Sequence, residues 1–227
     1  MKQASTSPKK PAPGHLLVAL MVMTTPSCET NRLTTARQDG AWMPLFDGNS
    51  LRNWKMTDFP SPGPVTVKDE KILLSAGQAM TGITWTGDFP RQNYEVRLKS
   101  MRVDGSDFFC CLTFPVGQGH CSLVLGGWGG SLVGLSSIDG LDASENETTE
   151  SIEFENGRPY AVKLSVSKEK IEVWLDDENI IDQAITDQEF SVRLEVEESL
   201  PFGIASYSTD AALWDLAMRT KPGKTSK

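Results

Sequence analysis

Residues 105–130, GSDFFCCLTFPVGQGHCSLVLGGWGG, contain three of the four cysteines, one of the two histidines and a tryptophan between two glycine pairs. A structural zinc site takes about four cysteine or histidine ligands, usually in closely spaced pairs. Cys110 and Cys111 are adjacent, so in a strand their side chains point to opposite faces and cannot share one ion. No second cysteine pair of suitable spacing follows. The sequence therefore predicts no metal-thiolate centre.

The same residues leave a disulfide as the alternative to free thiols. If PVGQG (115–119) is the turn between two strands, Phe114 lies opposite His120 and Cys111 is diagonal to Cys121. Diagonal neighbours in a sheet are about 7 to 8 Å apart, which is beyond disulfide reach. We therefore expect three buried free thiols that act as small apolar side chains.

His120 and Asp107 are the two candidates for proton transfer in this segment. His120 is the only imidazole after the N-terminal region, and its ordinary pKa suits acid and base work near neutral pH. A structural histidine at the start of a strand is the alternative. Asp107 follows Gly105 and Ser106, where its carboxylate either faces a ligand or accepts a hydrogen bond from a turn amide.

Trp128 is the candidate for ligand contact, because an indole face beside open backbone is a common platform for sugar rings. In the alternative, Trp128 belongs to the core and its glycines only permit a bulge. On strand 94–102, Glu95 and Arg97 fall on the solvent face and are candidates to line a groove. Ordinary solvated charges are the alternative for both.

The segment 136–158 is acidic, polar and poor in large apolar side chains, which is typical of a long surface loop. Its acids would supply the oxygen ligands that a divalent cation such as calcium prefers, but their spacing does not fit an EF-hand loop. Calcium therefore stays open, and no metal ligand is assigned. The four acids are Asp139, Asp142, Glu145 and Glu147.

From about residue 41 onward, apolar and polar residues alternate in short runs, which is typical of strands. Gly, Pro, Asn and Asp separate these runs, and the strands would position the residues named above. Residues 160–167 and 170–177 read as a hairpin, and residues 202–208 and 211–219 as a second pair. Many short strands with frequent turns are typical of a sandwich or barrel. We expect an all-β, two-sheet jelly roll.

The N-terminal region has the order of an export signal: lysines, the short apolar run LLVALMVM (16–23), and then small residues up to Cys28. Cys28 is a candidate for lipidation, with simple cleavage as the alternative. We expect a signal over 1–28, a polar spacer over 29–40, one domain over 41–220 and a basic tail over 221–227. Such a chain acts in the periplasm or cell envelope, and its only predicted membrane contact is a lipid anchor.

The formal net charge of -8 becomes -11 when the three lysines of residues 1–27 are removed with the signal. A strongly negative protein repels nucleic acid, so a nucleic-acid partner is excluded. No phosphate-binding glycine loop or Ser-His-Asp pattern is present. This balance of charge favours neutral or cationic ligands, and carbohydrates are among the neutral ones.

Four segments in this order resemble the 3-keto-disaccharide hydrolase family, also described as a 3-keto-glucoside lyase and 3-keto-2-hydroxyglucal hydratase domain. They are LFDGNSLRNWK (45–55), NYEVRLKSMRVDGSDFF (93–109), IEVWLDDENIID (171–182) and FGIASYS with AALWDLAMR near the C-terminus. The resemblance implies a concanavalin A-like jelly roll, a protein exported by bacteria and chemistry on sugars oxidised at C3. The chain departs from the family at Ser106-Asp107-Phe108, where an Asn-Ser-Gly segment is common, and at its cysteines and GGWGG.

Two functions follow. In the first, the protein cleaves 3-keto-glycosides by elimination and hydration. A base, with His120, Asp107 and Glu95 as candidates, removes the C2 proton, an acid protonates the leaving oxygen, and water adds to the double bond. Arg97 and Trp128 would hold the substrate. In the second, the domain binds carbohydrate without turnover.

Overall fold

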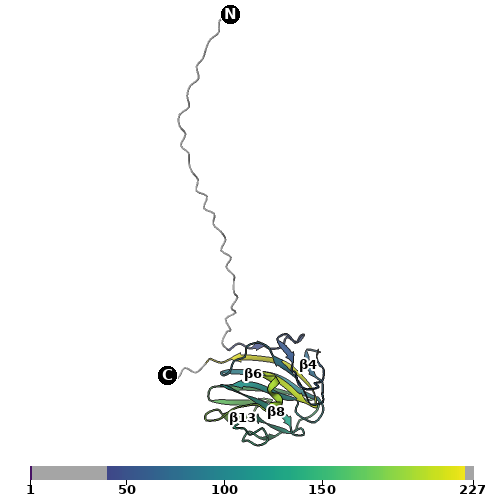
Figure 1. The fold of residues 1–227 in the computed structure, drawn as a ribbon, viewed down its shortest axis with the longest axis vertical. Coiled ribbons are helices and arrows are strands. Elements are labelled where there is room, and N and C mark those ends of the chain that lie inside the picture. The colour runs from purple at the N-terminus through teal and green to yellow at the C-terminus, as the bar shows by residue number, and fades with distance from the viewer. Residues whose placement is uncertain (2–39, 223–227) are drawn as a thin grey trace, which may run out of the picture. The chain divides into compact units, whose positions relative to one another are not determined.

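The computed structural model describes Met1 and residues 40–222, which fold into two antiparallel β-sheets packed face to face (Figure 1). Apart from one short 3-10 helix, every regular element in the described part is a strand. The structure confirms the all-β, two-sheet prediction. The predicted signal, Cys28 and the polar spacer lie outside the described residues, except for Gly40 at the end of the spacer.

The first sheet has eight strands, and every pairing in it is antiparallel. In spatial order they are β13 (Glu178–Ala184), β12 (Lys170–Leu175), β11 (Pro159–Val166), β6 (Tyr94–Asp104), β15 (Asp210–Thr220), β4 (Lys71–Leu74) and β3 (Val65–Lys68), with β1 (Met43–Pro44) also paired to β15.

The second sheet has seven strands, again all antiparallel. Its order is β10 (Glu150–Ser151), β9 (Leu132–Ser136), β8 (Gly119–Gly127), β7 (Cys110–Val116), β14 (Gly203–Tyr207), β5 (Met80–Trp85) and β2 (Trp54–Met56). The 3-10 helix η1 (Leu194–Ser199) lies between β13 and β14 in the chain.

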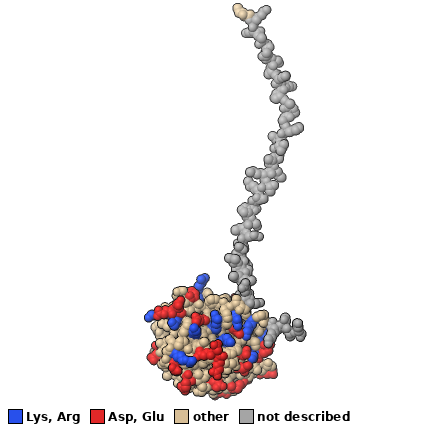
Figure 2. All heavy atoms as spheres, turned by 180° about the vertical axis from the view of Figure 1, so that it is seen from behind, with Lys and Arg blue, Asp and Glu red and all other residues tan. Residues whose placement is uncertain are grey.

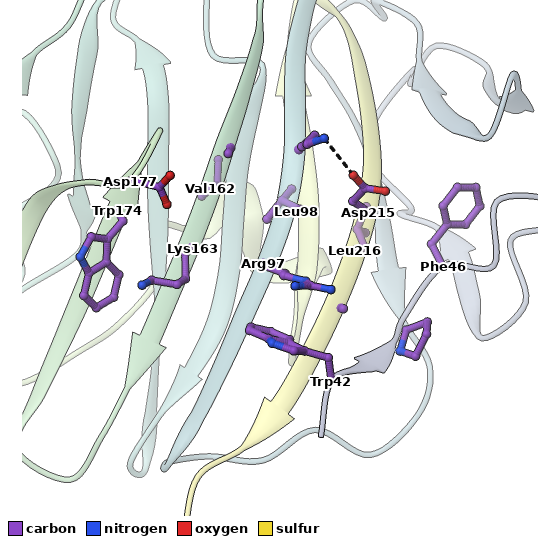
Figure 3. A pocket seen from close by; sticks show the side chains of 14 residues that line it. Trp42, Phe46, Arg97, Leu98, Val162, Lys163, Trp174, Asp177, Asp215 and Leu216 are labelled. Carbon is purple, nitrogen blue, oxygen red and sulfur yellow. Dashed lines mark ion pairs between the residues drawn. The ribbon is translucent and has the colours of Figure 1, made fainter. Parts of the chain in front are cut away.

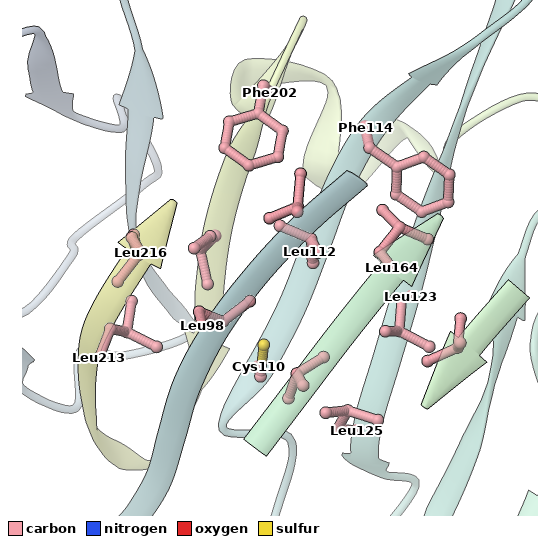
Figure 4. Packing of buried hydrophobic residues seen from close by; sticks show 14 of the residues in the cluster. Leu98, Cys110, Leu112, Phe114, Leu123, Leu125, Leu164, Phe202, Leu213 and Leu216 are labelled. Carbon is pink, nitrogen blue, oxygen red and sulfur yellow. The ribbon is translucent and has the colours of Figure 1, made fainter. Parts of the chain in front are cut away.

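The core lies between the sheets, where alternate residues of each strand meet. Leu98 and Leu164 come from the eight-stranded sheet, and Cys110, Leu112 and Leu123 come from the other (Figure 4). Because side chains alternate along a strand, the residues between these must point to the two outer faces. Those outer faces decide where a ligand can bind.

The predicted hairpin of residues 160–167 and 170–177 is confirmed, since β11 pairs with β12. The second predicted hairpin is wrong. β14 lies between β5 and β7 in one sheet, and β15 pairs with β6 in the other. The chain crosses between the sheets at Ser208 and buried Thr209, so a short connection between two strand-like runs does not here mean that the runs pair.

The predicted surface loop at 136–158 is partly wrong, because much of it packs against the seven-stranded sheet. Asn146 is buried, and its side-chain amide donates to the carbonyls of Leu135, Leu141 and Asp142. Its Oδ1 also accepts the hydroxyl of Thr148 at 2.6 Å. A few well-placed polar side chains, together with buried Ile138 and Phe154, therefore fold this mostly polar segment onto the domain.

Among the described residues, no helix has both the length and the apolar character needed to cross a membrane. This finding does not bear on the predicted lipid anchor, because Cys28 is outside the described part.

Candidate functional site

The outer face of the seven-stranded sheet is largely covered by chain from other parts of the domain. Phe59, Ala143 and Val196 of η1 form a second apolar cluster there with Cys111 and Val124 of the sheet. Small sheet residues allow this cover to approach. A Cβ on Gly203 would lie 2.7 Å from the carbonyl oxygen of Ser199, and one on Gly134 would lie 2.8 Å from that of Ala143.

Where the cover ends, a pocket of about 510 Å³ opens beside the turn between β8 and β9. The pocket combines aromatic, polar and apolar groups, as ligand pockets commonly do. Its lining is Ala79, Met80, Asp107, Phe108, Cys111, Ser122, Val124, Trp128, Ser136, Arg193, Glu195, Val196 and Tyr207. This pocket is the candidate site.

Trp128 projects at the tip of the β8–β9 turn and is 47% exposed, so it is not a core residue. Its φ is +48°, and Gly126, Gly129 and Gly130 also have positive φ, which glycine adopts at little cost. The register shift between Leu125 and Gly127 is a bulge. The glycines therefore permit a bulge, as the core alternative for Trp128 predicted. The indole itself is not in the core, because the bulge presents it at the surface.

Arg102 of β6 supports this turn from inside. It is 5% exposed and donates from Nη2 to the carbonyl of Gly130 at 2.7 Å. Its guanidinium also lies over the rings of Phe109 and Phe154, at 5.3 and 5.9 Å. A Cβ on Gly126 would lie 2.5 Å from Nη2, which explains why glycine occurs there. Burial lowers the pKa of Arg102.

Asp107 lies next to the same turn. Its Oδ1 accepts the amide of Phe108 at 2.7 Å, and its Oδ2 accepts the amide of Gly129 at 3.3 Å. Asp107 therefore satisfies turn amides, as the structural alternative predicted, while it also lines the pocket beside Trp128. The structure thus brings two of the predicted site residues together.

The far wall of the pocket carries an ion cluster around Arg193. Arg193 donates to both carboxylate oxygens of Glu195, at 3.0 and 3.3 Å, and to Asp142 at 2.6 Å. The hydrogen bonds from Arg193 lower the pKa of Glu195, so this carboxylate is held ionised. Two rings complete the opposite side, with Phe108 and Tyr207 centred 5.6 Å apart.

Cys110, Cys111 and Cys121 are free and buried, as predicted. Burial raises the pKa of Cys111 to about 12, so the one thiol that lines the pocket is protonated and unreactive at neutral pH. The predicted register is wrong by one residue: Phe114 lies opposite Cys121, not His120. The turn is the two-residue Gly117-Gln118, tighter than the predicted PVGQG, and Gly117 has the positive φ that such hairpins need.

His120 lies far from this pocket. It pairs with Pro115 near the end of β7, whereas Asp107 precedes the start of that strand. The eight residue-to-residue steps from Asp107 to Pro115 span roughly 26 Å at about 3.3 Å each in extended chain. The Nε2 atom of His120 is buried without a hydrogen-bond partner, and burial, with the nearby charge of Arg91, lowers its pKa.

Glu95 and Arg97 are on the solvent side of β6, as predicted, and therefore on the outer face of the other sheet. Glu95 is nevertheless buried by an ion pair with Arg219 and another with Lys221 at 2.8 Å. Burial alone would raise the pKa of Glu95, but the hydrogen bonds from Lys221 and Arg219 outweigh it and lower that pKa. The structure does not bring His120, Asp107 and Glu95 together.

Three of the four acidic residues named for calcium are engaged by residues 183–193, outside their own loop. Asp139 accepts the amide of Glu189, Asp142 binds Arg193, and Glu147 accepts side-chain amides from Gln183 and Gln188. Between residues 40 and 222, no three His, Cys, Asp or Glu side chains are grouped so as to hold a metal ion.

Sequence reasoning did not find Tyr207, Phe108, Arg193 or Glu195, which complete the pocket. Phe108 and Tyr207 read as ordinary strand residues, and their neighbours come from strands distant in the chain. The acidic run around Glu195 was a visible signal, but nothing in the sequence places η1 over the seven-stranded sheet.

A family model described as the 3-keto-alpha-glucoside-1,2-lyase-like domain matches residues 41–215, most of the chain. The chain belongs to this family. The predicted resemblance to this family is therefore confirmed for the domain. A sequence search of curated proteins finds no match.

Solved structures with the same fold have low sequence identity to this chain. A protein with a galectin-like fold from Bacillus subtilis superposes with a TM-score of 0.56 at 12% identity, covering 81% of this chain and 97% of that one. The Crh5 transglycosylase, solved in complex with NAG, gives 0.54 at 8% identity, covering 82% and 86%. The carbohydrate-binding module CBM66 from Bacillus subtilis gives 0.50 at 12%, covering 74% and 96%. These likenesses show the jelly-roll fold.

Proposed function

We propose that this domain binds carbohydrate in the pocket between Trp128 and Tyr207. The observation that carries the proposal is the exposed indole, held on a bulged turn by Arg102 and Asp107 beside a pocket that also contains aromatic rings and an ion cluster. Aromatic faces stack on the apolar faces of sugar rings, and the polar groups at the rim bind hydroxyls. Family membership and the names of two structural neighbours support a carbohydrate ligand.

Binding is favoured over catalysis by the state of the acids and bases in the pocket. Both oxygens of Asp107 accept backbone amides, Glu195 is paired with Arg193, and the Cys111 thiol has a raised pKa. His120 is at the other end of β7. Elimination from a 3-keto-sugar needs a free base and an acid near one another.

In the binding test, the full chain is titrated with neutral glucose and galactose oligosaccharides and with N-acetylglucosamine oligomers. Calorimetry measures the affinity for each sugar. Trp128→Ala should weaken the best ligand on the order of tenfold, because aromatic stacking contributes about 0.5 to 1.5 kcal/mol. Trp214→Ala, which removes a half-buried tryptophan of β15 that lines neither this pocket nor any other groove discussed below, is the matched control and should leave the affinity unchanged. A folded protein that binds none of these neutral sugars would overturn the proposal.

A second candidate function is cleavage of 3-keto-glycosides, which family membership favours. A base removes the C2 proton, the C1–O bond breaks as an acid protonates the leaving oxygen, and water adds across the new double bond. The test is incubation with a 3-keto-glucoside, with and without chelator, while 3-keto-glucose is measured. If turnover occurs, Asp107→Asn should lower it by about 10²- to 10⁴-fold. Sugar binding with no 3-keto-glucose formed would assign binding alone.

We also propose that the domain acts outside the cytoplasm, in the periplasm or cell envelope, on the strength of its N-terminal sequence. Fractionation of cells that express the chain tests this. Cys28→Ser should release the protein from the membrane fraction if Cys28 carries a lipid anchor. Unchanged membrane association in this variant would mean that lipid at Cys28 is not the anchor.

A further inference from the structure

The outer face of the eight-stranded sheet holds a second groove, of about 680 Å³, that lies on the opposite sheet from the proposed sugar pocket. Trp42 and Phe46 lie on one side of the groove, and Trp174 lies on the other (Figure 3). The floor is one rung of the sheet, in which Trp174, Lys163, Arg97, Ala217 and Pro44 lie opposite one another in turn.

This rung gives the groove its length. Four strand spacings of roughly 4.8 Å separate Trp174 from Pro44, about 19 Å in all. Ala217 lies in the floor between the two walls, and its small side chain keeps the floor low. A low floor between two aromatic walls suits a short extended chain of sugar rings.

The charges in the floor are unusual, because Lys163 and Arg97 are direct cross-strand neighbours. Like charges in this position destabilise a sheet. Within the described residues neither cation pairs with a carboxylate. Lys99 is different, because it pairs with Asp215 at 3.2 Å. Asp177 lines the groove but pairs with neither cation. Figure 2 shows lysine and arginine side chains interspersed with aspartate and glutamate side chains on the face that it draws.

Each of the two cations is instead held on a tryptophan. The Nζ of Lys163 lies 3.7 Å from the centre of the Trp174 ring, and the guanidinium of Arg97 lies 4.5 Å from that of Trp42. Cation–π contact orients a cation without neutralising it, so its hydrogen-bond donors remain available. Both cations are therefore positioned and still lack an anion.

We propose that this groove is a second binding site, for an acidic saccharide whose carboxylate or sulfate ester binds between Lys163 and Arg97. The anion would relieve the repulsion between these two cations, and Arg97 is suited to bidentate contact with a planar carboxylate. The walls contact the neighbouring rings of the sugar chain. An anionic membrane is a less suitable occupant than a small acidic sugar. A membrane surface would meet the net negative charge of the chain, which is -8, whereas a small sugar meets only the two cations of the groove.

The test titrates the full chain with a galacturonic acid trisaccharide, with a sulfated galactose trisaccharide, and with the neutral galactose trisaccharide. At least one acidic trisaccharide should bind at least tenfold more tightly than the neutral one, with affinity that falls as salt is added. The stronger of the two acidic ligands identifies the anion. If neither acidic trisaccharide binds, the proposal is overturned. The chain is also mixed with phosphatidylglycerol vesicles, and capture by these vesicles without binding of an acidic trisaccharide would overturn the proposal as well.

Variants then locate the binding. Arg97→Gln and Lys163→Gln should each weaken the acidic trisaccharide about tenfold, whereas Lys68→Gln, an exposed lysine on β3, should not. Lys163 lies over Trp174, whereas Arg97 lies over Trp42. The Lys163 variant therefore separates ligand binding from any role of Arg97 in holding Trp42 and the strand next to it. Trp128→Ala should leave acidic binding unchanged, which keeps this test independent of the proposed sugar pocket. Equal affinity in the Arg97→Gln, Lys163→Gln double variant and the parent would overturn the proposal.

Discussion

The two outer sheet faces of this domain follow the same alternation but have opposite surroundings. On the seven-stranded sheet, Gly134, Gly203 and Ala205 lie under Ala143, η1 and Phe59, so the middle of this face is buried, with the Trp128 pocket where the cover ends. On the eight-stranded sheet, the corresponding positions of β6 and β11 carry Arg97, Lys99 and Lys163 in an open groove. The glycines of the covered face therefore mark where other chain approaches the sheet closely.

The largest effect should come from adding bulk under the cover. Gly203→Ala places a Cβ 2.7 Å from the Ser199 carbonyl oxygen and 2.9 Å from that of Ile83, both backbone atoms that cannot move freely. Overpacking of this kind costs about 1 to 3 kcal/mol, which urea unfolding will measure.

Ala161→Val is the matched control on the open face, because Ala161 is exposed in β11 and valine suits a strand. Its free energy of unfolding should change by less than about 0.5 kcal/mol. Similar losses in the two variants would mean that the cover does not constrain the seven-stranded sheet.

Next in size is the loss of the support under the Trp128 turn. Arg102→Ala leaves the Gly130 carbonyl without its donor and removes a side chain that packs on Phe109 and Phe154. We expect a loss of about 1 to 3 kcal/mol and faster amide hydrogen exchange in residues 126–130. Arg158→Ala, an exposed arginine whose pair with Asp176 is at the surface, should change neither quantity appreciably. Unchanged exchange in Arg102→Ala would show that Arg102 does not hold the turn.

The sequence predicted the fold class because period-two alternation records which side of each strand meets the core. It predicted the faces of β6 correctly for the same reason. It failed for β14 and β15, since alternation says nothing about which sheet a strand joins. It also failed at the β7–β8 register, where the actual turn is shorter than the segment PVGQG suggested.

The site was only partly predictable. Asp107 and Trp128 are near each other in the chain and share one turn, so local reasoning found both. Arg97 was correctly placed on an outer face, but alternation could not tell which of the two faces holds Trp128. Arg193 and Tyr207 reach the pocket from segments about 65 to 80 positions beyond Trp128 in the sequence, and only the folded chain brings them there.

A smaller effect should appear in the pH dependence of stability, through His120 at the edge of the covered face. Burial and Arg91 lower its folded pKa below the ordinary value, so the unfolded chain takes up the proton first as pH falls. The contribution is fully present above the unfolded pKa of about 6.5 and declines as pH falls from there toward the folded pKa. Urea unfolding between pH 7.5 and 5.5 should therefore show falling stability.

His120→Gln supplies the control, because glutamine does not titrate in this range. The variant should have a flatter pH dependence between pH 7.5 and 5.5 than the parent. His120 is the only histidine among the described residues, so a parent and variant with the same slope would contradict a neutral, half-buried imidazole in the fold.

The smallest effect should come from the ion pair of the open face. Lys99 and Asp215 are 3.2 Å apart, and their side chains are 47% and 60% exposed. Water and salt screen such a pair, so a double-mutant cycle with Lys99→Ala and Asp215→Ala should give a coupling of about 0.2 to 1 kcal/mol that shrinks at high salt. The same cycle on Arg193 and Asp142, where the Asp142 side chain is only 17% exposed, should give a larger and less salt-sensitive coupling, because burial reduces screening. Equal couplings in the two cycles would show that the cover over the seven-stranded sheet does not exclude water from its charged edge.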